Sequence, residues 1–408
     1  MSIGNTPLSR EITLANWMDP PYNRDAFQRV RELAPTALIA RSSGEPASLP
    51  VDPININAIA FRAADGSSTT WARSIVNTWC DAVCVVHRGR IVHEQYLNGM
   101  HERQPHLLMS VSKSICGALL GIAINRGQFS VDDLVCDVAP EFAGTSLDGA
   151  TVRHVIDMTA GTDFDEDYDA YAAVSSDEHD PVVPLIEYER HAGYRPLGAA
   201  TPVGTLGHFR TYGTAYSHGA WFQYRSPLTN IAARLLEVVN GMRYPDIVAR
   251  DLWTPLGQEH DADIMLDPLG HPVVEGGMSC TLRDLARFGV AYLNDGRANG
   301  QQIIPRAWVD DTRLGDDAAV AAFASSPASD EESRDWSMYR NAFWVMERGN
   351  VFSGLGIFGQ YCWIHRPSQT VVARFSTYPS ALPFDISAEV LRGFDAVAES
   401  LSSGGPAR

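Results

Sequence analysis

The chain has 408 residues with a net charge of −17 at pH 7, and 45% of its residues are hydrophobic. This composition predicts a globular fold with a sizeable core and excludes disorder, collagen and coiled coil. The acidic surface would repel phosphate backbones, so we expect no nucleic-acid partner. The sequence has no run of 18 apolar residues, and its N-terminus lacks the pattern of a signal peptide. We therefore expect a cytoplasmic protein without a membrane span.

Taken in chain order, the predicted elements begin after a polar, proline-rich segment. Residues 1–60 contain one helical patch, at 25–33. Residues 82–97 predict a β-hairpin, because a β-branched run and a return strand flank the turn 88–90. Residues 110–125 predict an apolar helix that ends before Gly127.

The middle of the chain has a mostly helical pattern. Ser226 as N-cap and Pro227 at the first helical position begin a predicted helix that ends at Gly241. Thr281 and Asp284 predict a capping box for a helix that runs to about residue 294. The acidic, low-complexity stretch 314–335 is predicted to be a mobile loop.

Predicted strands return near the C-terminus, at 342–347, 361–365 and 370–375, before a last helix at 385–401. The predicted fold class is α+β: an antiparallel sheet built from both chain ends and flanked by helices, with an inserted, mostly helical region. We expect residues 1–60 to form an extension packed on a catalytic domain of residues 61–150 and 270–408. Residues 151–269 would then form the helical region.

A single lysine, Lys113, stands among 31 arginines. A codon bias toward arginine accounts for the arginines but leaves this one lysine to be explained. An amine in a shielded site can lose its proton, whereas a guanidinium effectively cannot. We therefore predict that Lys113 is functional.

Lys113 closes the sequence Ser110-Val111-Ser112-Lys113 at the start of a predicted apolar helix. Residues i and i+3 share one face of a helix, so the Ser110 hydroxyl lies within reach of the Lys113 amine. The N-terminus of a helix favours a neutral amine and offers free N–H groups to an oxyanion. The pattern predicts a serine nucleophile with a lysine general base. The competing interpretation is a serine cap beside a solvated lysine.

Proton delivery to a leaving group needs a third residue. Tyr224 lies two residues before Ser226, the N-cap of the predicted helix that starts at Pro227, and its side chain can serve as phenol or phenolate. The chain has 14 tyrosines, so an ordinary core or surface aromatic is the alternative interpretation.

Three blocks of sequence carry a family resemblance: HLLMSVSKSICGALLGIAI, FQYRSPLTNIAARLLEVVNG and EGGMSCTLRDLARFGVAYLNDG. In order and spacing they resemble the penicillin-recognising serine hydrolases, the β-lactamase and transpeptidase superfamily, over roughly residues 15–400. The branch that the chain resembles most is that of the 6-aminohexanoate-dimer hydrolases, enzymes of nylon-oligomer breakdown, with their esterase relatives. The resemblance implies Ser110 as nucleophile, Lys113 as its base and Tyr224 as acid/base. It also implies Ser226 as a substrate-binding residue.

The segment 353–360 (SGLGIFGQ) resembles the third motif of that branch. This resemblance implies an oxyanion hole formed by the N–H groups of Ser110 and Ile357, with Gly356 at the substrate. The branch typically has a histidine where this chain has Phe358, so no polar contact is expected from that side chain.

Residues 163–171 (DFDEDYDAY) contain two further candidates. Tyr168 matches a tyrosine of the branch that closes over the bound amide, and Tyr171 is the rival assignment. The alternative for both tyrosines is that they are ordinary surface aromatics without a role in binding.

Other patterns predict neither an organic cofactor nor a metal. The glycines of 354–359 fit G-x-G-x-x-G but open no predicted helix, so the dinucleotide interpretation fails. The 12 histidines show no ligand spacing, and the six cysteines form no C-x-x-C and are predicted to be reduced core thiols. The third motif, residues 354–360, contains no cationic residue and no histidine. Arg348 and His365 lie outside it. Carboxylate-bearing β-lactams are therefore predicted to be poor substrates, and an uncharged acyl side is predicted to be preferred.

Together these residues predict a serine hydrolase that cleaves small linear amides or esters through an acyl-enzyme on Ser110. Two alternatives stay open: an esterase or acyltransferase with the same fold, and a non-catalytic binding protein. The predicted partner is a small-molecule substrate, and a homodimer is left open.

Overall fold

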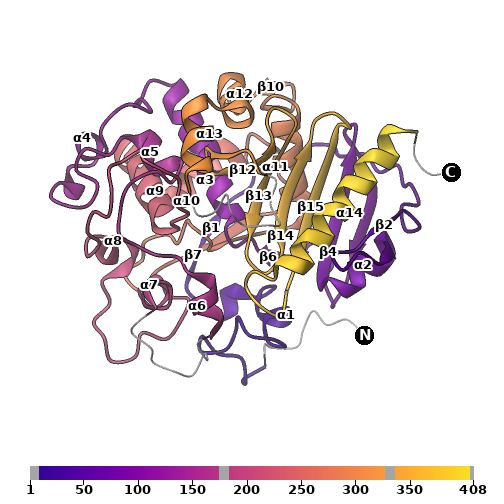
Figure 1. Ribbon diagram of the computed structural model, residues 1–408, viewed down its shortest axis with the longest axis horizontal. Helices are drawn as coiled ribbons and strands as arrows, with labels where there is room; N and C mark the ends of the chain where they lie inside the picture. The colour runs from indigo at the N-terminus through magenta and orange to yellow at the C-terminus, as the bar shows by residue number, and fades with distance from the viewer. Residues whose placement is uncertain (1–8, 174–182, 327–335, 405–408) are drawn as a thin grey trace.

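A computed structural model describes residues 9–173, 183–326 and 336–404, and its centre is a seven-stranded antiparallel sheet (Figure 1). The strand order is β11-β12-β13-β14-β15-β4-β5. The sheet is therefore built from both chain ends, as predicted, and the α+β class is confirmed. Its strands are β4 (Cys80–His87), β5 (Arg90–Tyr96), β11 (Met338–Arg340), β12 (Phe343–Glu347), β13 (Val351–Gly356), β14 (Gln360–His365) and β15 (Thr370–Ser376).

Helices cover both faces of this sheet, so β4 and β15 are buried along their whole lengths. On one face, α2 (Trp71–Asn77) and α14 (Phe384–Ser402) pack over a core that includes Trp71, Trp363 and Phe394 (Figure 1). On the other face, α3 (Val111–Asn125) and α11 (Leu282–Leu293) contact the strands. Long apolar runs such as that of β4 are expected for strands covered on both sides.

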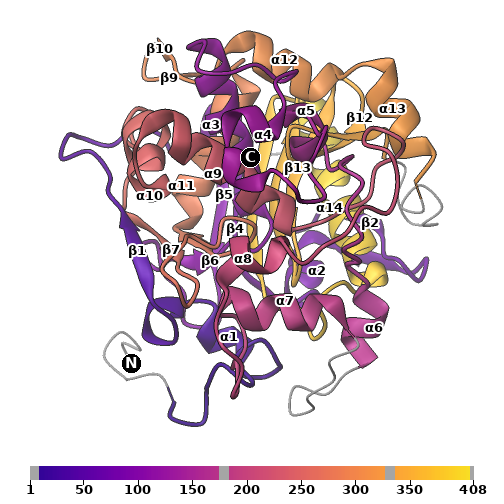
Figure 2. The same cartoon turned by 90° about the vertical axis from the view of Figure 1, so that its left-hand side faces the viewer.

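The helical middle of the chain lies on the side of α3 away from the sheet (Figure 2). Helix α3 contacts both β13 and α9, and it is buried from Val111 through Ala123. The N-terminus of α3 therefore opens at the junction between the sheet and the helical region. This region contains α4 (Val135–Val138), η3 (Pro140–Phe142), α5 (Val152–Ile156), α6 (Tyr168–Ala173), α7 (Pro184–Ala192), α8 (Gly204–Phe209), α9 (Pro227–Asn240), α10 (Tyr244–Val248) and η4 (Ala249–Trp253).

A second, four-stranded sheet, in the order β1-β7-β8-β6, leads the chain into α3. It consists of β1 (Thr36–Ile39), β6 (His106–Leu107), β7 (Ala262–Met265) and β8 (Met278–Cys280). Because β6 is hydrogen-bonded to β8, the residues just after β6 are held in place before α3 begins. The remaining elements are α1 (Asn23–Ala26), η2 (Val30–Glu32), β2 (Ala60–Arg62), β3 (Ser68–Thr70), β9 (Arg297–Ala298), β10 (Gln301–Gln302), α12 (Arg306–Leu314) and α13 (Asp317–Ala324).

Two predictions of local structure were wrong. The helical patch at 25–33 consists of two short pieces, α1 and η2. The predicted loop at 314–335 contains α13, because the Asp316 side chain caps it by accepting a hydrogen bond from the Ala319 N–H at 2.8 Å. Residues 327–335 of that stretch lie outside the described residues.

The predicted side-chain caps of α9 and α11 do not form. Pro227 does begin α9 and Gly241 ends it in the left-handed conformation, but the Ser226 hydroxyl makes no cap. Thr281 precedes α11 without capping it, and its hydroxyl donates to Asp284 at 2.7 Å. The Asp284 carboxylate accepts hydrogen bonds from the backbone N–H groups of residues 259 and 260, so tertiary contacts replace the capping box.

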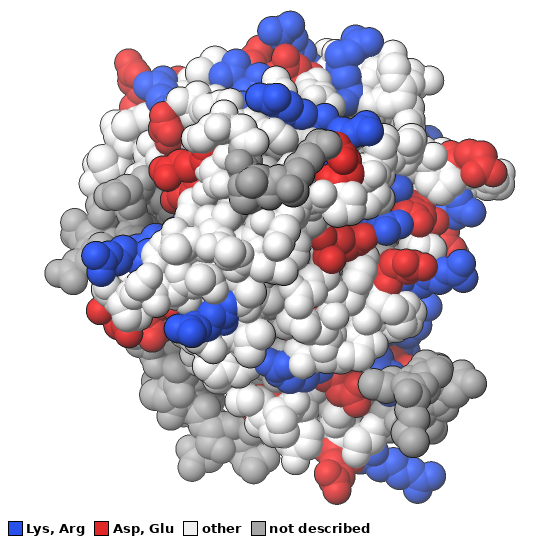
Figure 3. Space-filling view, turned by 90° about the vertical axis from the view of Figure 1, so that its right-hand side faces the viewer, with Lys and Arg blue, Asp and Glu red and all other residues white. Residues whose placement is uncertain are grey.

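All six cysteines are free, and five of them are buried, as predicted for core thiols. Among the described residues, no helix is both long and apolar enough to cross a membrane. On the face shown in Figure 3, basic and acidic side chains are interspersed, with a broad uncharged area between them.

Candidate active site

Ser110 and Lys113 lie at the N-terminal end of α3, on one face, as their spacing predicted. The Lys113 Nζ atom donates to the Ser110 hydroxyl oxygen at 2.7 Å and to the Glu275 carbonyl oxygen at 2.7 Å. Lys113 is 1% exposed. Burial lowers the pKa of Lys113 to about 8, although the Glu166 and Glu275 carboxylates oppose this shift. A substantial fraction of the amine is thus neutral near pH 8 and can accept the Ser110 proton.

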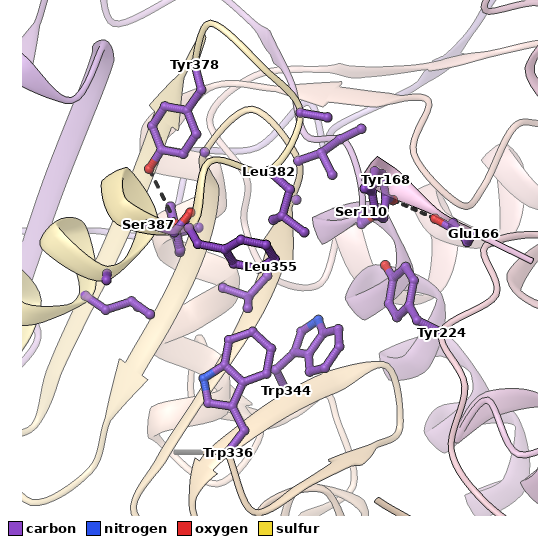
Figure 4. A pocket seen from close by; sticks show the side chains of 18 residues that line it. Ser110, Glu166, Tyr168, Tyr224, Trp336, Trp344, Leu355, Tyr378, Leu382 and Ser387 are labelled. Carbon is purple, nitrogen blue, oxygen red and sulfur yellow. Dashed lines mark hydrogen bonds between the residues drawn. The ribbon is translucent and has the colours of Figure 1, made fainter. Parts of the chain in front are cut away.

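Tyr224 lies on the other side of Ser110. Its ring stacks on Trp344, with 5.4 Å between centroids, and the Lys113 Nζ atom lies 5.0 Å from the Tyr224 ring centroid. Figure 4 shows the Tyr224 hydroxyl pointing toward Ser110. Burial and the Glu166 carboxylate raise the pKa of Tyr224 well above its ordinary value, so it is a phenol that can donate a proton. The structure brings Ser110, Lys113 and Tyr224 together.

The end of β13 passes directly beside Ser110. A β-carbon on Gly356 would lie 2.6 Å from the Leu108 carbonyl oxygen and 3.0 Å from the Ser110 nitrogen, so only glycine allows this approach. Ser110 and Ile357 line the same cavity, and neither N–H has an acceptor among the described residues. Two free donors at one cavity are what an oxyanion hole requires.

The backbone around both donors is strained. Met109, before Ser110, has φ of 45°, and Phe358, after Ile357, has φ of 61°. Such left-handed conformations are uncommon for side chains of this size and occur at functional sites. The Phe358 ring is buried against Phe27, with 5.3 Å between centroids, and does not line the cavity. This agrees with the expectation that its side chain makes no polar contact.

Glu166 connects two of the predicted substrate-binding residues, and the sequence analysis did not single it out. The Tyr168 hydroxyl donates to the Glu166 carboxylate at 2.6 Å (Figure 4). The Ser226 N–H and hydroxyl also donate to it, at 2.6 and 2.8 Å. Tyr168 lines the cavity, whereas the rival Tyr171 is 8% exposed and accepts a hydrogen bond from Arg195 at 2.9 Å. The structure therefore places Tyr168, and not Tyr171, at the site.

The cavity in front of Ser110 has a volume of about 150 Å³ and a mostly apolar wall. Figure 4 shows Trp336 and Trp344 at one end and Tyr378 with Ser387 at the other. Arg348 and His365 do not line it: Arg348 pairs with Asp317, and His365 contacts Ser368. The other lining residues are Ser110, Glu166, Tyr168, Tyr224, Leu355, Gly356, Ile357, Gly359, Tyr361, Ala381, Leu382, Phe384, Ala388 and Leu391.

A smaller chamber of about 40 Å³ shares Ser110 and Ile357 with this cavity. Three carboxylates line it, from Glu166, Glu189 and Glu275, and within the described parts of the chain only that of Glu189 is paired with an arginine, Arg195. Among the described residues, no lysine, arginine or histidine lines either space.

Glu275 is the second functional candidate that the sequence analysis missed. It is 3% exposed, and neither carboxylate oxygen has a hydrogen bond of good geometry, although Tyr188 and Asn230 lie beside it. Burial raises the pKa of Glu275 to about 7, and the charge of Lys113 opposes this shift. The signal was available, because Glu275 begins the third resemblance block and Glu166 lies within the segment that holds Tyr168.

The fold and this arrangement of side chains are those of a hydrolase with the β-lactamase fold. The Beta-lactamase family model matches residues 78–393, and the chain belongs to that family. Its sequence is 34% identical to that of the 6-aminohexanoate-dimer hydrolase of Paenarthrobacter ureafaciens over 398 residues, and this alignment covers 95% of each chain. The predicted resemblance is confirmed, and the chain is an enzyme. The alternative of a non-catalytic binding protein is therefore set aside.

Two solved structures show the same fold. A Bacillus anthracis protein, provisionally named a 6-aminohexanoate-dimer hydrolase, superposes with a TM-score of 0.87 at 22% identity, over 98% of this chain and all of the other. EstCE1, a hydrolase with promiscuous acyltransferase activity, superposes with a TM-score of 0.57 at 14% identity, over 79% of this chain and 98% of the other.

Proposed function

We propose that this enzyme hydrolyses small linear amides or esters through an acyl-enzyme on Ser110. The observation that carries the proposal is the buried Lys113 amine, whose pKa is lowered to about 8, in contact with the Ser110 hydroxyl at 2.7 Å. A catalytic base is most effective when its pKa lies near the working pH.

In the first half of the reaction, Ser110 Oγ attacks the substrate carbonyl carbon while Lys113 takes the hydroxyl proton. The N–H groups of Ser110 and Ile357 hold the negative oxygen of the tetrahedral intermediate. Tyr224 gives its proton to the departing amine or alcohol, and the Lys113 ammonium returns a proton to Tyr224. The product of this half is an ester on Ser110, with the leaving group released.

In the second half, water attacks the ester carbonyl and gives its proton to the Lys113 and Tyr224 pair. The ester bond to Ser110 breaks, and Ser110 Oγ recovers a proton from the same pair. The acid leaves and the three side chains return to their starting protonation states. Each turnover thus consumes one water and one amide or ester bond.

The two spaces beside Ser110 suggest the shape and charge of the substrate. The large cavity favours an apolar chain, and the chamber lined by Glu166 and Glu275 favours a cationic group over a carboxylate. The curated relative is named for a dimer of 6-aminohexanoate, a linear amide of an ω-amino acid. We therefore infer a linear substrate with an apolar chain and an ammonium end. The prediction of an uncharged acyl side is the alternative that the following test separates from it.

The test compares p-nitrophenyl 6-aminohexanoate with p-nitrophenyl hexanoate, which differ only by the ammonium group. We expect kcat/KM to favour the amino ester by about tenfold, the size of one charge-assisted contact. Glu275→Gln should reduce this preference, and Glu102→Gln, in an exposed loop, should leave it unchanged. If neither ester were hydrolysed, the proposed hydrolysis would be contradicted. Equal kcat/KM for the two esters would contradict only the inferred ammonium end of the substrate. Capture of the acyl group by hydroxylamine in preference to water would favour an acyltransferase.

A further inference from the structure

Three side chains of metal-binding type gather on α7 and α8, outside both spaces beside Ser110. Glu187 and His191 lie four residues apart on α7, and therefore on one face, and His208 lies on α8. One candidate ligand atom from each residue lies within 4.8 Å of the other two. The two helices are in contact and lie side by side in both ribbon views (Figures 1 and 2).

The spacing of these atoms is close to that of a tetrahedral metal site. His191 Nε2 and Glu187 Oε1 are 3.4 Å apart. Ligands about 2.1 Å from a tetrahedral ion lie roughly 3.4 Å from one another. The rings of His191 and His208 have centroids 4.7 Å apart, and the candidate ligand atoms lie within 4.8 Å of one another, so the three side chains must move closer together to bind an ion.

The His208 ring is oriented by a side chain next to it. Its Nδ1 atom is 2.9 Å from the Tyr212 hydroxyl, and such a contact orients a ligand ring and leaves Nε2 free. On His191, Nδ1 accepts a long hydrogen bond from the Val203 N–H at 3.5 Å, which a metal ion on Nε2 would displace.

We propose that Glu187, His191 and His208 bind one divalent transition-metal ion, with Zn²⁺ as the representative of that class. Two imidazole nitrogens and one carboxylate oxygen, with water in the fourth position, are a ligand set that suits Zn²⁺. The Arg190 guanidinium donates to the other Glu187 oxygen at 2.8 Å, which leaves Oε1 for the ion.

The position of the cluster indicates a structural role. Tyr188 follows Glu187 on α7, and its side chain lines the chamber beside Ser110. None of the three ligands lines either space, so the ion fixes α7 to α8 behind the chamber wall and does not touch the substrate. The histidines show no ligand spacing in the sequence, because His208 lies on a separate helix from Glu187 and His191. The pair Glu187 and His191, four residues apart, was the available signal.

The test is a calorimetric titration of the full-length, metal-free protein with Zn²⁺, with Tm measured in parallel. We expect one Zn²⁺ per chain and a Tm that rises with Zn²⁺ concentration, while Mg²⁺, which prefers oxygen ligands, has no such effect. His208→Gln should abolish stoichiometric binding, and Glu187→Gln should weaken it at least tenfold. His101→Gln, at an exposed position, is the matched control and should bind as the wild type does.

Absence of stoichiometric Zn²⁺ binding by the wild type would overturn the proposal. So would equal affinity in the wild type, His208→Gln and Glu187→Gln. Glu187 is half-exposed, so its glutamine variant should keep the metal-free Tm and separate lost binding from lost folding. Ser110→Ala should bind Zn²⁺ unchanged, which makes the result independent of the proposed function.

Discussion

Glu166 holds Ser226 at two points, because its carboxylate accepts both the N–H and the hydroxyl of that residue, at 2.6 and 2.8 Å. Ser226 lies two residues after Tyr224 and directly before α9, so this contact fixes the segment that carries Tyr224. The same carboxylate accepts a hydrogen bond from the Tyr168 hydroxyl, and its negative charge raises the pKa of Lys113. One acidic side chain thus connects Tyr168, the segment that carries Tyr224, and Lys113.

The pH dependence of the wild type and of Glu166→Gln tests this connection. Only the neutral Lys113 amine acts as a base, so kcat/KM for a p-nitrophenyl ester should rise with pH through an apparent pKa of about 8. Burial lowers this pKa and the Glu166 carboxylate raises it, so removing the carboxylate charge should move the rise to lower pH. The measurement is the profile of kcat/KM from pH 5 to 10.

Glu102→Gln removes a carboxylate from an exposed loop and is the control for that profile. It should leave the apparent pKa unchanged. A Glu166→Gln profile that coincides with that of the wild type, or moves to higher pH, would show that Glu166 does not stabilise the Lys113 ammonium.

Gly356→Ala tests the oxyanion hole. The added β-carbon would lie 2.6 Å from the Leu108 carbonyl oxygen and 3.0 Å from the Ser110 nitrogen, so β13 and its following residue Ile357 must shift away. Loss of one oxyanion donor typically lowers kcat by about 10²–10³-fold, and we expect a decrease of that order. Gly44→Ala, where the nearest atom is the Ser42 hydroxyl at 3.3 Å, should keep full activity. A Gly356→Ala enzyme with wild-type kcat would place the oxyanion elsewhere.

Tyr168→Phe and Tyr171→Phe separate the two tyrosines that the sequence left open. Tyr168→Phe removes the hydrogen bond to Glu166 at the cavity, and we expect kcat/KM to decrease about tenfold, the effect of roughly 1.4 kcal/mol. Tyr171→Phe removes a hydrogen bond with Arg195 away from the cavity, so it should lower Tm and leave kcat/KM unchanged. The opposite pattern in steady-state kinetics and thermal unfolding would reverse the assignment.

The parts of the site that depend on local spacing were predictable from the sequence. Ser110 and Lys113 are three residues apart on one helix, and the β4–β5 hairpin follows from a β-branched run and a turn. Ile357 and Tyr168 came from the family resemblance. Glu166 and Glu275 lie in segments that the resemblance already marked, but local spacing could not assign their contacts, which are with residues 60 and 162 positions away. The low complexity of residues 314–335 hides helix α13 in the sequence, and the local signal for this helix is its Asp316 cap.

β-Lactam antibiotics should be poor substrates. Their carboxylate needs a cationic partner, and among the described residues that line the two spaces none is basic, while three are glutamates. We expect kcat/KM for nitrocefin to be well below that for p-nitrophenyl 6-aminohexanoate. Nitrocefin turnover above that of the ester would mean that an arginine from elsewhere reaches the substrate.

Fluorophosphonate treatment followed by intact-protein and peptide mass spectrometry tests whether Ser110 carries the acyl group. We expect one phosphonyl group per wild-type chain, located on Ser110. Ser110→Ala should show no label and no hydrolysis while keeping its Tm. A label on Ser112 or Ser114, or hydrolysis that persists in Ser110→Ala, would show that Ser110 is not the nucleophile.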